Sequence, residues 1–278
     1  MTNDQTSMTD ATGKTIIPHS ILTLFTALKI LTAPSPMHRF FISQTDLSKN
    51  SYGTNDKELC HQFSKVLKLR VDEKIILLDN TEHEYLAELT MVSKSRCEAK
   101  ILEKTKKPDI SSKTAVHLFV PPLKNQNRWE LILEKGTELG VASFTPLITE
   151  RTEVKELRKL DRLERIVKEA AEQSGRTKLP IINEPITFQK IVQTQDLASQ
   201  YANLIASLYE GARPISHYKL TATTSNLFLG PVGDFTTDEV EFSVEHNFYP
   251  VSLGSQILRT ETAAIALSAL LLCHSGAK

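Results

Sequence analysis

The sequence predicts a mixed α/β protein with two unlike halves, a small barrel of short strands and an α/β domain built on a mostly parallel sheet. Between residues 40 and 107, short apolar runs alternate with tight-turn residues, a spacing typical of small barrels. From residue 115 onward, strand-like runs alternate with segments of helical periodicity, which indicates a parallel sheet. Residues 104–113 are charged, contain Pro108 and lack periodicity, so we expect the domain boundary there.

The first half contains one clear hairpin and one half-buried strand. Residues 74–78 (KIILL) form a compact apolar run, residues 79–81 supply turn chemistry, and residues 85–89 (YLAEL) form the returning strand. Residues 97–101 alternate between apolar and charged side chains, which is the period-2 pattern of a strand with one buried face.

The second half opens with a buried strand at residues 115–120 and an amphipathic helix after it. The apolar positions of that helix recur at helical spacing, namely Trp129, Ile132, Leu133, Gly136 and Gly140. The two glycines lie one turn apart and would let another backbone approach that face closely. The later elements are strands at residues 144–148, 204–208 and 227–230, and a second helix marked by Leu160, Leu163, Val167, Ala170 and Ala171.

Composition places the chain among ordinary globular proteins. Its 278 residues suit two modest domains, and 40% hydrophobic with 24% charged residues is enough apolar material for a core. Lys plus Arg equals Asp plus Glu at 33 each, so the formal net charge is zero. This balance argues against nucleic-acid binding through a uniform positive field, although local patches and shape can still recognise RNA.

The cysteines argue against a disulfide framework and against a metal site. Cys60, Cys97 and Cys273 are odd in number, and none lies within metal-ligand spacing of another. We therefore expect three reduced thiols in a cytoplasmic protein that binds no metal.

The first 36 residues differ from the rest of the chain. Residues 1–15 are polar and carry two acids, while residues 16–33 are largely apolar but interrupted by a proline, a histidine and a lysine. The apolar part is too short and broken for a membrane span, and the acidic lead is unlike a signal or transit peptide. We expect residues 1–36 to be an extension outside the fold, disordered or undocked, with Met37 as a candidate true start. A weak membrane or targeting segment is the alternative.

Two glycine loops follow apolar strands and are candidate ligand sites. Residues 229–234 (LGPVGD) end one strand, and ligands of α/β sheets bind beyond the carboxyl ends of strands. Thr236 with Glu239 forms a capping-box pattern, so a helix begins just after this loop. Taken alone, the loop is equally well explained as an ordinary strand-to-helix turn.

The second loop, residues 252–260, is more informative. Gly254 follows a strand-like run, and residues 263–272 form a helix that is apolar nearly all round, so it must be buried in a core or an oligomer interface. Arg259 and Glu261 stand at the start of this helix, and charges at the edge of a buried site need partners or a function. The alternative is a capped helix with a surface Arg–Glu pair.

Several other sites are excluded or left open. Neither glycine loop matches the dinucleotide or nucleoside-triphosphate patterns, and neither a nucleophile elbow nor a zinc-protease helix is present. Basic residues gather near the first helices of the second half, where a phosphate-binding surface and a solvated helix face with ion pairs are equally good readings. These residues are Arg151, Lys155, Arg158, Lys159, Arg162, Arg165, Lys168, Arg176 and Lys178.

Several segments together resemble one family, the RsmE-type 16S ribosomal RNA uracil-N3 methyltransferases. The similar segments are residues 37–41 (MHRFF), 61–70 (HQFSKVLKLR), 134–151, 169–176 (EAAEQSGR) and the two glycine loops, and they run from Met37 to about Leu272. The strings EAAEQSGR and ILRTETA are specific to the family, whereas either glycine loop alone would not be.

This resemblance implies a PUA-like RNA-binding barrel at residues 37–110 and a SPOUT α/β methyltransferase domain with a C-terminal trefoil knot at residues 115–278. It also implies S-adenosyl-L-methionine as the cofactor, a homodimer, and ribosomal RNA of the small ribosomal subunit as the substrate, with no membrane partner.

The resemblance also assigns roles to residues. The cofactor pocket would be lined by Leu229, Gly230, Pro231, Gly233, Ser252, Leu253, Gly254, Ile257, Leu258 and Arg259. Arg259 would face the methyl donor and the uracil. Apart from the resemblance, the need to deprotonate N3 of uracil makes Glu261 a candidate general base. His38, Arg39, Arg70, Arg151 and Arg176 would contact RNA.

One departure from the family pattern stands in the first glycine loop. The family usually reads GPEGG, whereas this chain reads GPVGD, so Val232 removes a carboxylate and Asp234 adds one. Three alternative functions therefore stay open: a non-catalytic RNA-binding protein with a degenerate knot, a SPOUT methyltransferase acting on another RNA, and an α/β enzyme acting on a small molecule.

Overall fold

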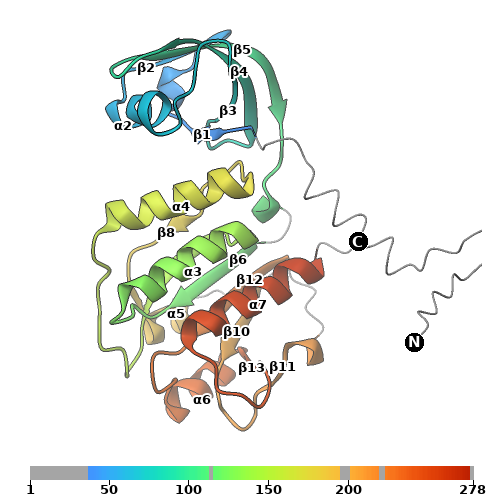
Figure 1. The fold of residues 1–278 in the computed structure, drawn as a ribbon. Helices are drawn as coiled ribbons and strands as arrows, with labels where there is room; N and C mark the ends of the chain where they lie inside the picture. The colour runs from blue at the N-terminus through green and yellow to red at the C-terminus, as the bar shows by residue number, and fades with distance from the viewer. Residues whose placement is uncertain (1–36, 113–114, 195–200, 219–222, 276–278) are drawn as a thin grey trace, which may run out of the picture. The chain divides into compact units, whose positions relative to one another are not determined.

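The computed structural model describes residues 37–112, 115–194, 201–218 and 223–275. The expected extension at residues 1–36 lies outside the described residues. Within the described ranges the chain forms a curled five-stranded sheet and an eight-stranded parallel sheet (Figure 1). The mixed α/β architecture expected from the sequence is confirmed.

The five-stranded sheet has the strand order β1-β3-β4-β5-β2, and only the β1–β3 pair is parallel. Its strands are β1 (Arg39–Phe41), β2 (Ser51–Thr54), β3 (Lys74–Leu78), β4 (His83–Val92) and β5 (Cys97–Lys106). The predicted β3–β4 hairpin is confirmed, and Asp79 holds its turn by accepting hydrogen bonds from Thr81 and Tyr85. β5 extends to Lys106, so the first residues of the segment expected to separate the domains belong to a strand.

One buried cluster fills the curl of this sheet. Phe40, Tyr52, Phe63 and Leu77 are fully buried, and the predicted alternation in β5 places Cys97 inside with them. The short elements η1 (Gln44–Asp46), α2 (Lys57–His61) and η2 (Gln62–Val66) contribute to this half of the chain. The side chain of Asp56 caps α2 by accepting a hydrogen bond from Leu59 N.

The side chains of Cys60 and Cys97 are described, and both are free thiols inside this cluster. Burial, reinforced by the neighbouring Cys97, raises the pKa of the Cys60 thiol to about 12. Cys60 is therefore protonated at neutral pH and unreactive in the folded state.

The eight-stranded sheet has the order β11-β13-β10-β12-β6-β7-β8, with β9 pairing beside β7, and all of its described pairings are parallel. Its strands are β6 (Ala115–Val120), β7 (Ser143–Ile148), β8 (Ile181–Ile182), β9 (Ile186–Thr187), β10 (Tyr201–Ala206), β11 (Arg213–Pro214), β12 (Thr224–Leu229) and β13 (Tyr249–Ser252). The apolar run predicted at residues 204–208 leaves the sheet at Ala206, and Leu208 is exposed in the loop that follows.

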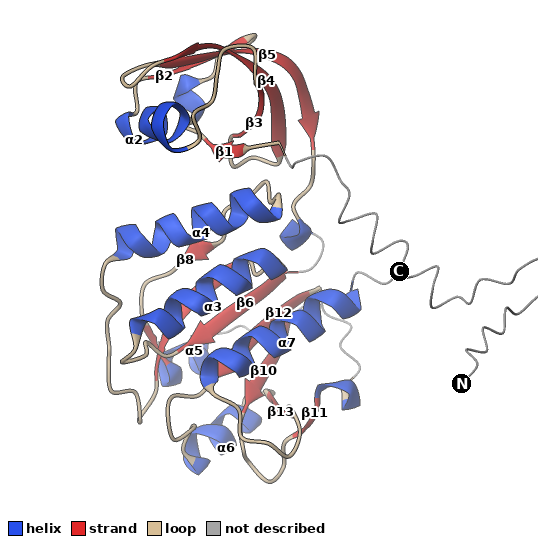
Figure 2. Cartoon of the chain, in the orientation of Figure 1, coloured by secondary structure: helices blue, strands red, loops and turns tan. Residues whose placement is uncertain are grey.

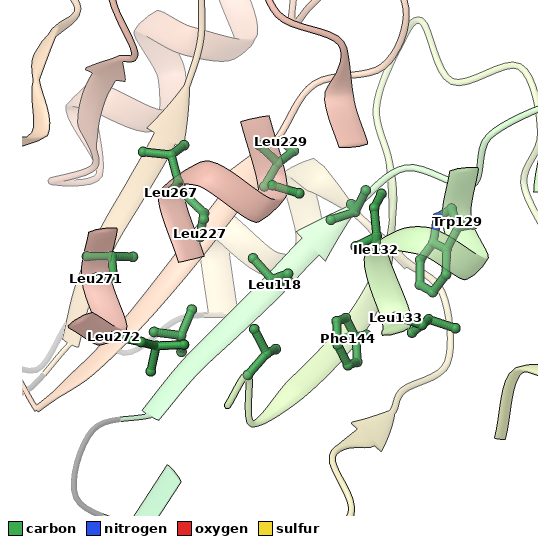
Figure 3. Packing of buried hydrophobic residues seen from close by; sticks show 14 of the residues in the cluster. Leu118, Trp129, Ile132, Leu133, Phe144, Leu227, Leu229, Leu267, Leu271 and Leu272 are labelled. Carbon is green, nitrogen blue, oxygen red and sulfur yellow. The ribbon is translucent and has the colours of Figure 1, made fainter. Parts of the chain in front are cut away.

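Helices cover both faces of this sheet (Figure 2). They are α3 (Gln126–Leu139), α4 (Leu160–Ser174), α5 (Phe188–Thr194), α6 (Thr237–Glu245) and α7 (Thr260–Ser275), with short turns η3 (Ile110–Ser112) and η4 (Ile215–His217). Trp129 and Leu267 lie in one cluster (Figure 3), and Leu163 belongs to the same cluster, so α3, α4 and α7 lie on the same face. Phe188 and Val240 belong to a second cluster, which places α5 and α6 on the opposite face.

The alternation of side chains along β12 separates these two clusters. Leu227 and Leu229 point into the cluster under α3 and α7, whereas Phe228 packs with the aromatic rings of the other face. Because a strand sends successive side chains to opposite faces, a continuous apolar run in a strand must be covered on both sides. The run Leu227–Leu229 of β12 is covered in this way.

The two glycines of α3 make room for side chains rather than for another backbone, which corrects the sequence-based expectation. A Cβ at Gly136 would lie 2.7 Å from Cε1 of Phe144. Gly140 ends α3 with φ +106°, and a Cβ there would lie 2.5 Å from Cγ2 of Ile110. Each glycine therefore admits a bulky apolar neighbour at a place where alanine would collide.

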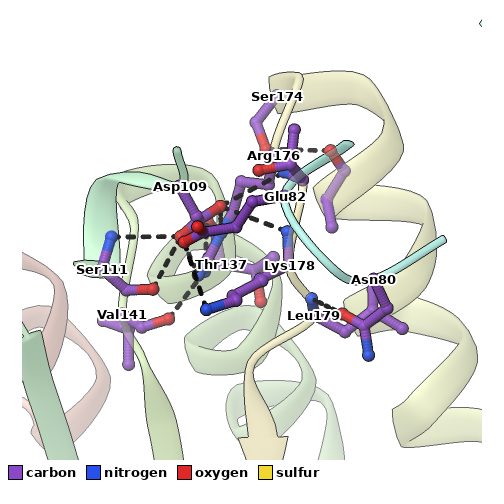
Figure 4. Close-up of polar contacts among 12 residues, drawn as sticks. Asn80, Glu82, Asp109, Ser111, Thr137, Val141, Ser174, Arg176, Lys178 and Leu179 are labelled. Atoms are coloured by element: carbon purple, nitrogen blue, oxygen red, sulfur yellow. Dashed lines mark hydrogen bonds and ion pairs between the residues drawn. The ribbon is translucent and has the colours of Figure 1, made fainter. Parts of the chain in front are cut away.

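A buried polar network fixes the segment after β5 to the loop after α4 (Figure 4). Asp109 Oδ1 lies 2.9 Å from Nη2 of Arg176, and its Oδ2 accepts hydrogen bonds from the backbone of Thr177 and Lys178. Arg176 also donates to the carbonyl oxygen of Val141 at 2.6 Å. Burial alone would raise the pKa of Asp109, but the hydrogen bond and charge of Arg176, together with the hydrogen bonds from Ser111, outweigh it and lower that pKa.

Candidate active site

A cavity of about 560 Å³ opens at the carboxyl ends of β10, β12 and β13. In parallel sheets this end is where ligands bind. The loops after the three strands form its walls, and all ten residues predicted for the cofactor pocket line it. They are Leu229, Gly230, Pro231, Gly233, Ser252, Leu253, Gly254, Ile257, Leu258 and Arg259.

The loop after β12 is a tight turn that needs its glycines. A Cβ at Gly230 would lie 2.7 Å from Oδ1 of Asp234, and Gly233 has φ +93°. Asp234 also adopts a positive φ of 63°, an unusual conformation for a residue with a side chain. This strain falls on the residue that departs from the family pattern.

Asp234 compensates for that conformation with hydrogen bonds. Its Oδ2 accepts from the backbone N of Leu208 at 2.7 Å, and its Oδ1 accepts from the backbone N of Phe235 at 2.8 Å. The carboxylate thus joins the loop after β12 to the loop after β10. The family usually has glutamate at the position of Val232. The side chain of Val232 is 78% exposed and does not connect the two loops.

The loop after β13 lies open to the cavity. Gly254 has φ +113°, and a Cβ built there meets nothing within 4 Å. Thr260 Oγ1, at the start of α7, donates to the carbonyl oxygen of Gly230 at 3.1 Å. This bond holds the two glycine loops together around the same cavity.

Arg259 and Glu261 both line the cavity, but their surroundings differ. Arg259 is exposed, whereas the side chain of Glu261 is only 10% exposed. Glu261 Oε1 lies 3.5 Å from Nε of Arg128, while its buried Oε2 has no hydrogen-bond partner among the described residues. A buried acceptor without a donor is costly, so Oε2 is suited to accept a hydrogen bond from a ligand.

The residues predicted to contact RNA are not gathered in one place. Arg151 lies beside the loop after β12, where its Nη1 donates to the carbonyl oxygens of Gly233 and Phe235. Arg70 is exposed in the loop before β3, and His38 is exposed at the start of the described chain. Arg39 is partly buried with its Nε 3.8 Å from Oε1 of Glu84.

Arg176 does not lie on the surface, and its burial argues against the predicted RNA contact. Its side chain is 4% exposed, and its guanidinium is taken up by Asp109 and by two backbone carbonyls. A guanidinium held in this way would have to break a buried ion pair to reach a phosphate. The structure gives Arg176 a packing role instead.

The basic stretch of α4 fits the solvated-face reading better than a phosphate site. Arg162 pairs with Glu130 at 2.8 Å, Arg165 lies 3.4 Å from Glu58, and Lys168 lies 4.0 Å from Glu172. These are exposed or partly exposed pairs of the kind that contribute little to stability.

Sequence reasoning missed the part of the cavity that comes from β10 and α3. Ala206, Ser207 and Leu208 line it from the end of β10, Leu123 lines it from the loop between β6 and α3, and Arg128 lines it from the first turn of α3. The strand ending at Ala206 was visible in the sequence, but its position between β12 and β13 was not. Knowledge of the strand order would have directed attention to this third loop.

Two further findings concern the described residues as a group. No cluster of histidine, cysteine or acidic side chains among them is arranged to hold a metal ion. Likewise, none of the helices in the described ranges is long and apolar enough to cross a membrane.

Comparisons with known proteins decide the family. A family model described as an RNA methyltransferase domain matches residues 111–272, and an RNA methyltransferase PUA domain matches residues 64–102. The chain is 34% identical over 206 residues to the ribosomal RNA small subunit methyltransferase E of Rickettsia conorii, an alignment that covers 74% of this chain and 82% of the relative. The chain belongs to the ribosomal RNA small subunit methyltransferase E family. The resemblance found in the sequence motifs is thereby confirmed.

Other members of the methyltransferase E family match over nearly their whole length. The Bacillus subtilis relative is 29% identical over 251 residues, covering 84% of this chain and 96% of that protein. Among solved structures, methyltransferase E from Neisseria gonorrhoeae bound to S-adenosyl methionine aligns with a TM-score of 0.76 at 29% identity, covering 86% of this chain and 98% of that one. The PUA-like barrel expected in the first half is supported by the same alignments.

Proposed function

We propose that this protein transfers a methyl group from S-adenosyl-L-methionine to N3 of a uridine in 16S ribosomal RNA of the small subunit. The observation that carries the proposal is the single cavity lined by all ten residues that match the family's cofactor loops. The names of the relatives support a ribosomal RNA substrate, and the Neisseria gonorrhoeae neighbour supports the cofactor.

The residues present fit this cofactor. The volume of about 560 Å³ falls within the usual range of small-molecule pockets, roughly 300–1,000 Å³. Gly230 makes room for the tight turn at Asp234, and a Cβ at Gly254 would meet nothing within 4 Å, so backbone groups of both loops are accessible to the flat adenine. The unpaired Oε2 of Glu261 can accept a hydrogen bond from a donor group of the cofactor or of the substrate base. When bound, the cofactor supplies an electrophilic methyl group on a sulfonium centre.

The reaction requires N3 of uracil to lose its proton. A new N3–methyl bond forms as the sulfur–methyl bond breaks, the sulfur keeps the bonding electron pair, and the N3 proton passes to a base. Negative charge spreads onto O2 and O4 of the base as N3 is deprotonated. A fixed cation beside those oxygens stabilises this charge where it develops.

Arg259 is the residue proposed for that cation. It is exposed in the cavity wall immediately before α7, where its side chain is available to a second molecule beside the cofactor. Glu261, two residues later, is the proposed general base, because its carboxylate has one oxygen that no donor occupies. His38, Arg39, Arg70 and Arg151 are proposed to contact the RNA.

The domain organisation is part of the proposal. Residues 1–36 would be an extension, residues 37–110 the PUA-like RNA-binding barrel, and residues 115–278 the SPOUT domain. The separate hydrophobic clusters of the two sheets support this division.

A trefoil knot at the C-terminal end is supported by the path of the chain. The segment leaving β12 passes along α6 on one face to reach β13, which lies on the far side of β10. The chain then returns along α7 on the opposite face, where α7 packs beside α3 and β6. A knot would thread the C-terminal segment through the loop after β12, and Thr260 at the start of α7 contacts Gly230 of that loop.

A homodimer is proposed from the surface of α7. Leu270 is 48% exposed although the helix is apolar, and Ile265, Ala266 and Ala269 are only half-buried. An apolar helix face left in water is typical of an association surface. A cytoplasmic location fits an enzyme that modifies ribosomal RNA.

The proposal is tested by calorimetric titration of the purified protein with S-adenosyl-L-methionine, with the Arg259→Ala variant in parallel. We expect saturable binding at one site per chain in both proteins. Arg259→Ala should then methylate unmodified small subunits about 100- to 1,000-fold more slowly, the usual loss when one transition-state contact is removed. A folded protein that binds no cofactor would favour the non-catalytic RNA-binding alternative, and near-normal transfer by the variant would remove Arg259 from the mechanism.

A further inference from the structure

The turn after β7 contacts the loop after β12, residues 230–236, although the two strands are not neighbours. The sheet order places β6 between them. In this turn, residues 149–152, the backbone N of Thr149 donates to Oγ1 of Thr152 at 2.9 Å, and the backbone N of Thr152 donates to the carbonyl oxygen of Thr149 at 3.2 Å. Both threonines are buried, so the turn holds Glu150 and Arg151, which lie between them, in a defined place.

Arg151 is bound to the backbone of the loop after β12. Its Nη1 donates to the carbonyl oxygens of Gly233 and Phe235, the latter at 3.3 Å. A Cβ built at Gly233 would lie 3.8 Å from Cδ of Arg151, so the stem of this side chain also lies against the glycine. The two carbonyl groups flank Asp234, which lines the cofactor cavity.

This part of the loop has a backbone conformation that needs support. Gly233 has φ +93°, and Asp234, which carries a side chain, has φ 63°. A residue with a side chain in this region is strained and persists only where the surrounding structure holds it. The two hydrogen bonds from Arg151 supply such support, together with those that Asp234 itself accepts.

Glu239 joins the same two segments from the first turn of α6. Its Oε2 accepts a hydrogen bond from the backbone N of Thr236 at 2.9 Å, which is its part of the capping box. Its Oε1 accepts a hydrogen bond from the backbone N of Glu150, also at 2.9 Å. One carboxylate therefore binds both the end of the loop after β12 and the turn after β7.

We propose that Glu239 and Arg151 are positioning residues that clamp the loop after β12 in the conformation that binds the cofactor. Neither residue lines the cofactor cavity, so both act through the loop. A loop that samples other conformations binds its ligand more weakly, in proportion to the fraction of time that it spends in the competent one. The clamp raises that fraction without touching the cofactor. This inference rests on the proposed function and adds two residues that prepare its cofactor site.

Glu239→Gln separates the clamp from the helix cap. Its amide oxygen can accept from the backbone N of Thr236 and keep the capping box, because glutamine serves in that motif as glutamate does. Its amide nitrogen cannot accept from the backbone N of Glu150. The control Asp238→Asn removes a charge from an exposed side chain in the same first turn of α6.

Calorimetric titration of the full-length protein with S-adenosyl-L-methionine, without RNA, measures the effect. Glu239→Gln should weaken binding about threefold to tenfold, as the loss of one hydrogen bond predicts, and Asp238→Asn should change it by less than about twofold. Arg151→Gln should weaken binding by a similar factor, and Arg151→Lys, which keeps a donor for the carbonyl oxygens, should recover part of the loss. Omitting RNA separates this role of Arg151 from its proposed RNA contact.

Steady-state kinetics distinguish this role from a catalytic one. Glu239→Gln should raise the KM for S-adenosyl-L-methionine and leave kcat within about twofold of the wild type, because it removes binding that the ground state and the transition state share.

Hydrogen exchange of the cofactor-free protein tests the clamp without a ligand. The backbone amides of Glu150 and of residues 234–236 should exchange faster in Glu239→Gln than in the wild type or in Asp238→Asn. Equal cofactor affinity of Glu239→Gln and Asp238→Asn would overturn the positioning role, and equal exchange would overturn the clamp itself. Failure of the proposed function is seen in the wild type instead: a folded protein that binds no cofactor would overturn that function, and the positioning role with it.

Discussion

At the scale of single residues, this chain departs from its family at two positions, one held by hydrogen bonds and one exposed to solvent. Asp234 has φ 63° and receives hydrogen bonds from Leu208 and Phe235, so it is built into the site. The side chain of Val232 is 78% exposed and is not packed into the site. The loss of a carboxylate at one position and its gain at the other are therefore not an exchange of equivalent groups.

Replacing Asp234 by alanine should destabilise the protein and weaken cofactor binding. The variant loses two hydrogen bonds and leaves a side chain at positive φ, which together cost about 1–3 kcal/mol in the free energy of unfolding. Urea denaturation and cofactor calorimetry measure the two effects. The matched change Val232→Glu, which restores the usual family residue, should alter stability by less than about 0.5 kcal/mol. Equal effects of the two substitutions would show that Asp234 does not hold the loop.

At the scale of elements, the sequence predicted those features that depend on neighbours in the chain. The β3–β4 hairpin, the strand β6 and the capping box of α6 were all visible because apolar periodicity and turn residues are local signals. The ends of elements were less accurate, since β5 continues through charged residues to Lys106 and β10 stops at Ala206.

The contributions of β10 and α3 to the candidate site could not be predicted in the same way. Leu208 reaches the cavity only because β10 lies between β12 and β13, and strand order is a non-local property. Arg128 reaches it because α3 packs beside α7, which is likewise a non-local contact. The burial of Arg176 could not be predicted for a related reason. Its motif is specific to the family, but a specific motif does not distinguish a residue that binds ligand from one that holds two segments together.

The Asp109–Arg176 pair should be a major contributor to stability between the elements that it joins. Both side chains are almost fully buried, and removing one partner of such a pair leaves an uncompensated charge, at a cost of about 3–5 kcal/mol. Arg176→Leu should therefore lower the free energy of unfolding by that amount in urea titrations. A loss below 1 kcal/mol would contradict the packing role and reopen the RNA contact.

The same pair predicts a dependence of stability on pH. Because the pKa of Asp109 is lower in the folded protein than in the unfolded chain, its contribution is fully present above the unfolded value, about 4, and is lost as the pH falls through the folded pKa. Asp109→Asn should flatten the acid side of the stability profile measured by thermal unfolding between pH 2 and 6. If the stability of Asp109→Asn falls with pH as steeply as that of the wild type, the contact with Arg176 does not lower the pKa of Asp109.

At the scale of the whole molecule, the proposed association through α7 gives the clearest prediction. Leu270→Glu places a charge in an exposed apolar face and should shift the protein from dimer to monomer in sedimentation experiments. Val66→Glu is the control, because Val66 is also exposed, at 62%, but belongs to η2 in the first half. Dimers of unchanged stability in the Leu270 variant would rule out this face as the interface.

The central claim is the chemical outcome, and one measurement tests it most directly. Unmodified small ribosomal subunits are incubated with the protein and S-adenosyl-L-methionine carrying a labelled methyl group, and the RNA is digested to nucleosides for mass spectrometry. The account predicts label in 3-methyluridine at about one methyl group per subunit, and an initial rate of labelling about 100- to 1,000-fold lower when Arg259→Ala replaces the wild type. Label in another nucleoside or on a ribose, or no label with a protein that binds cofactor and subunits, would contradict it.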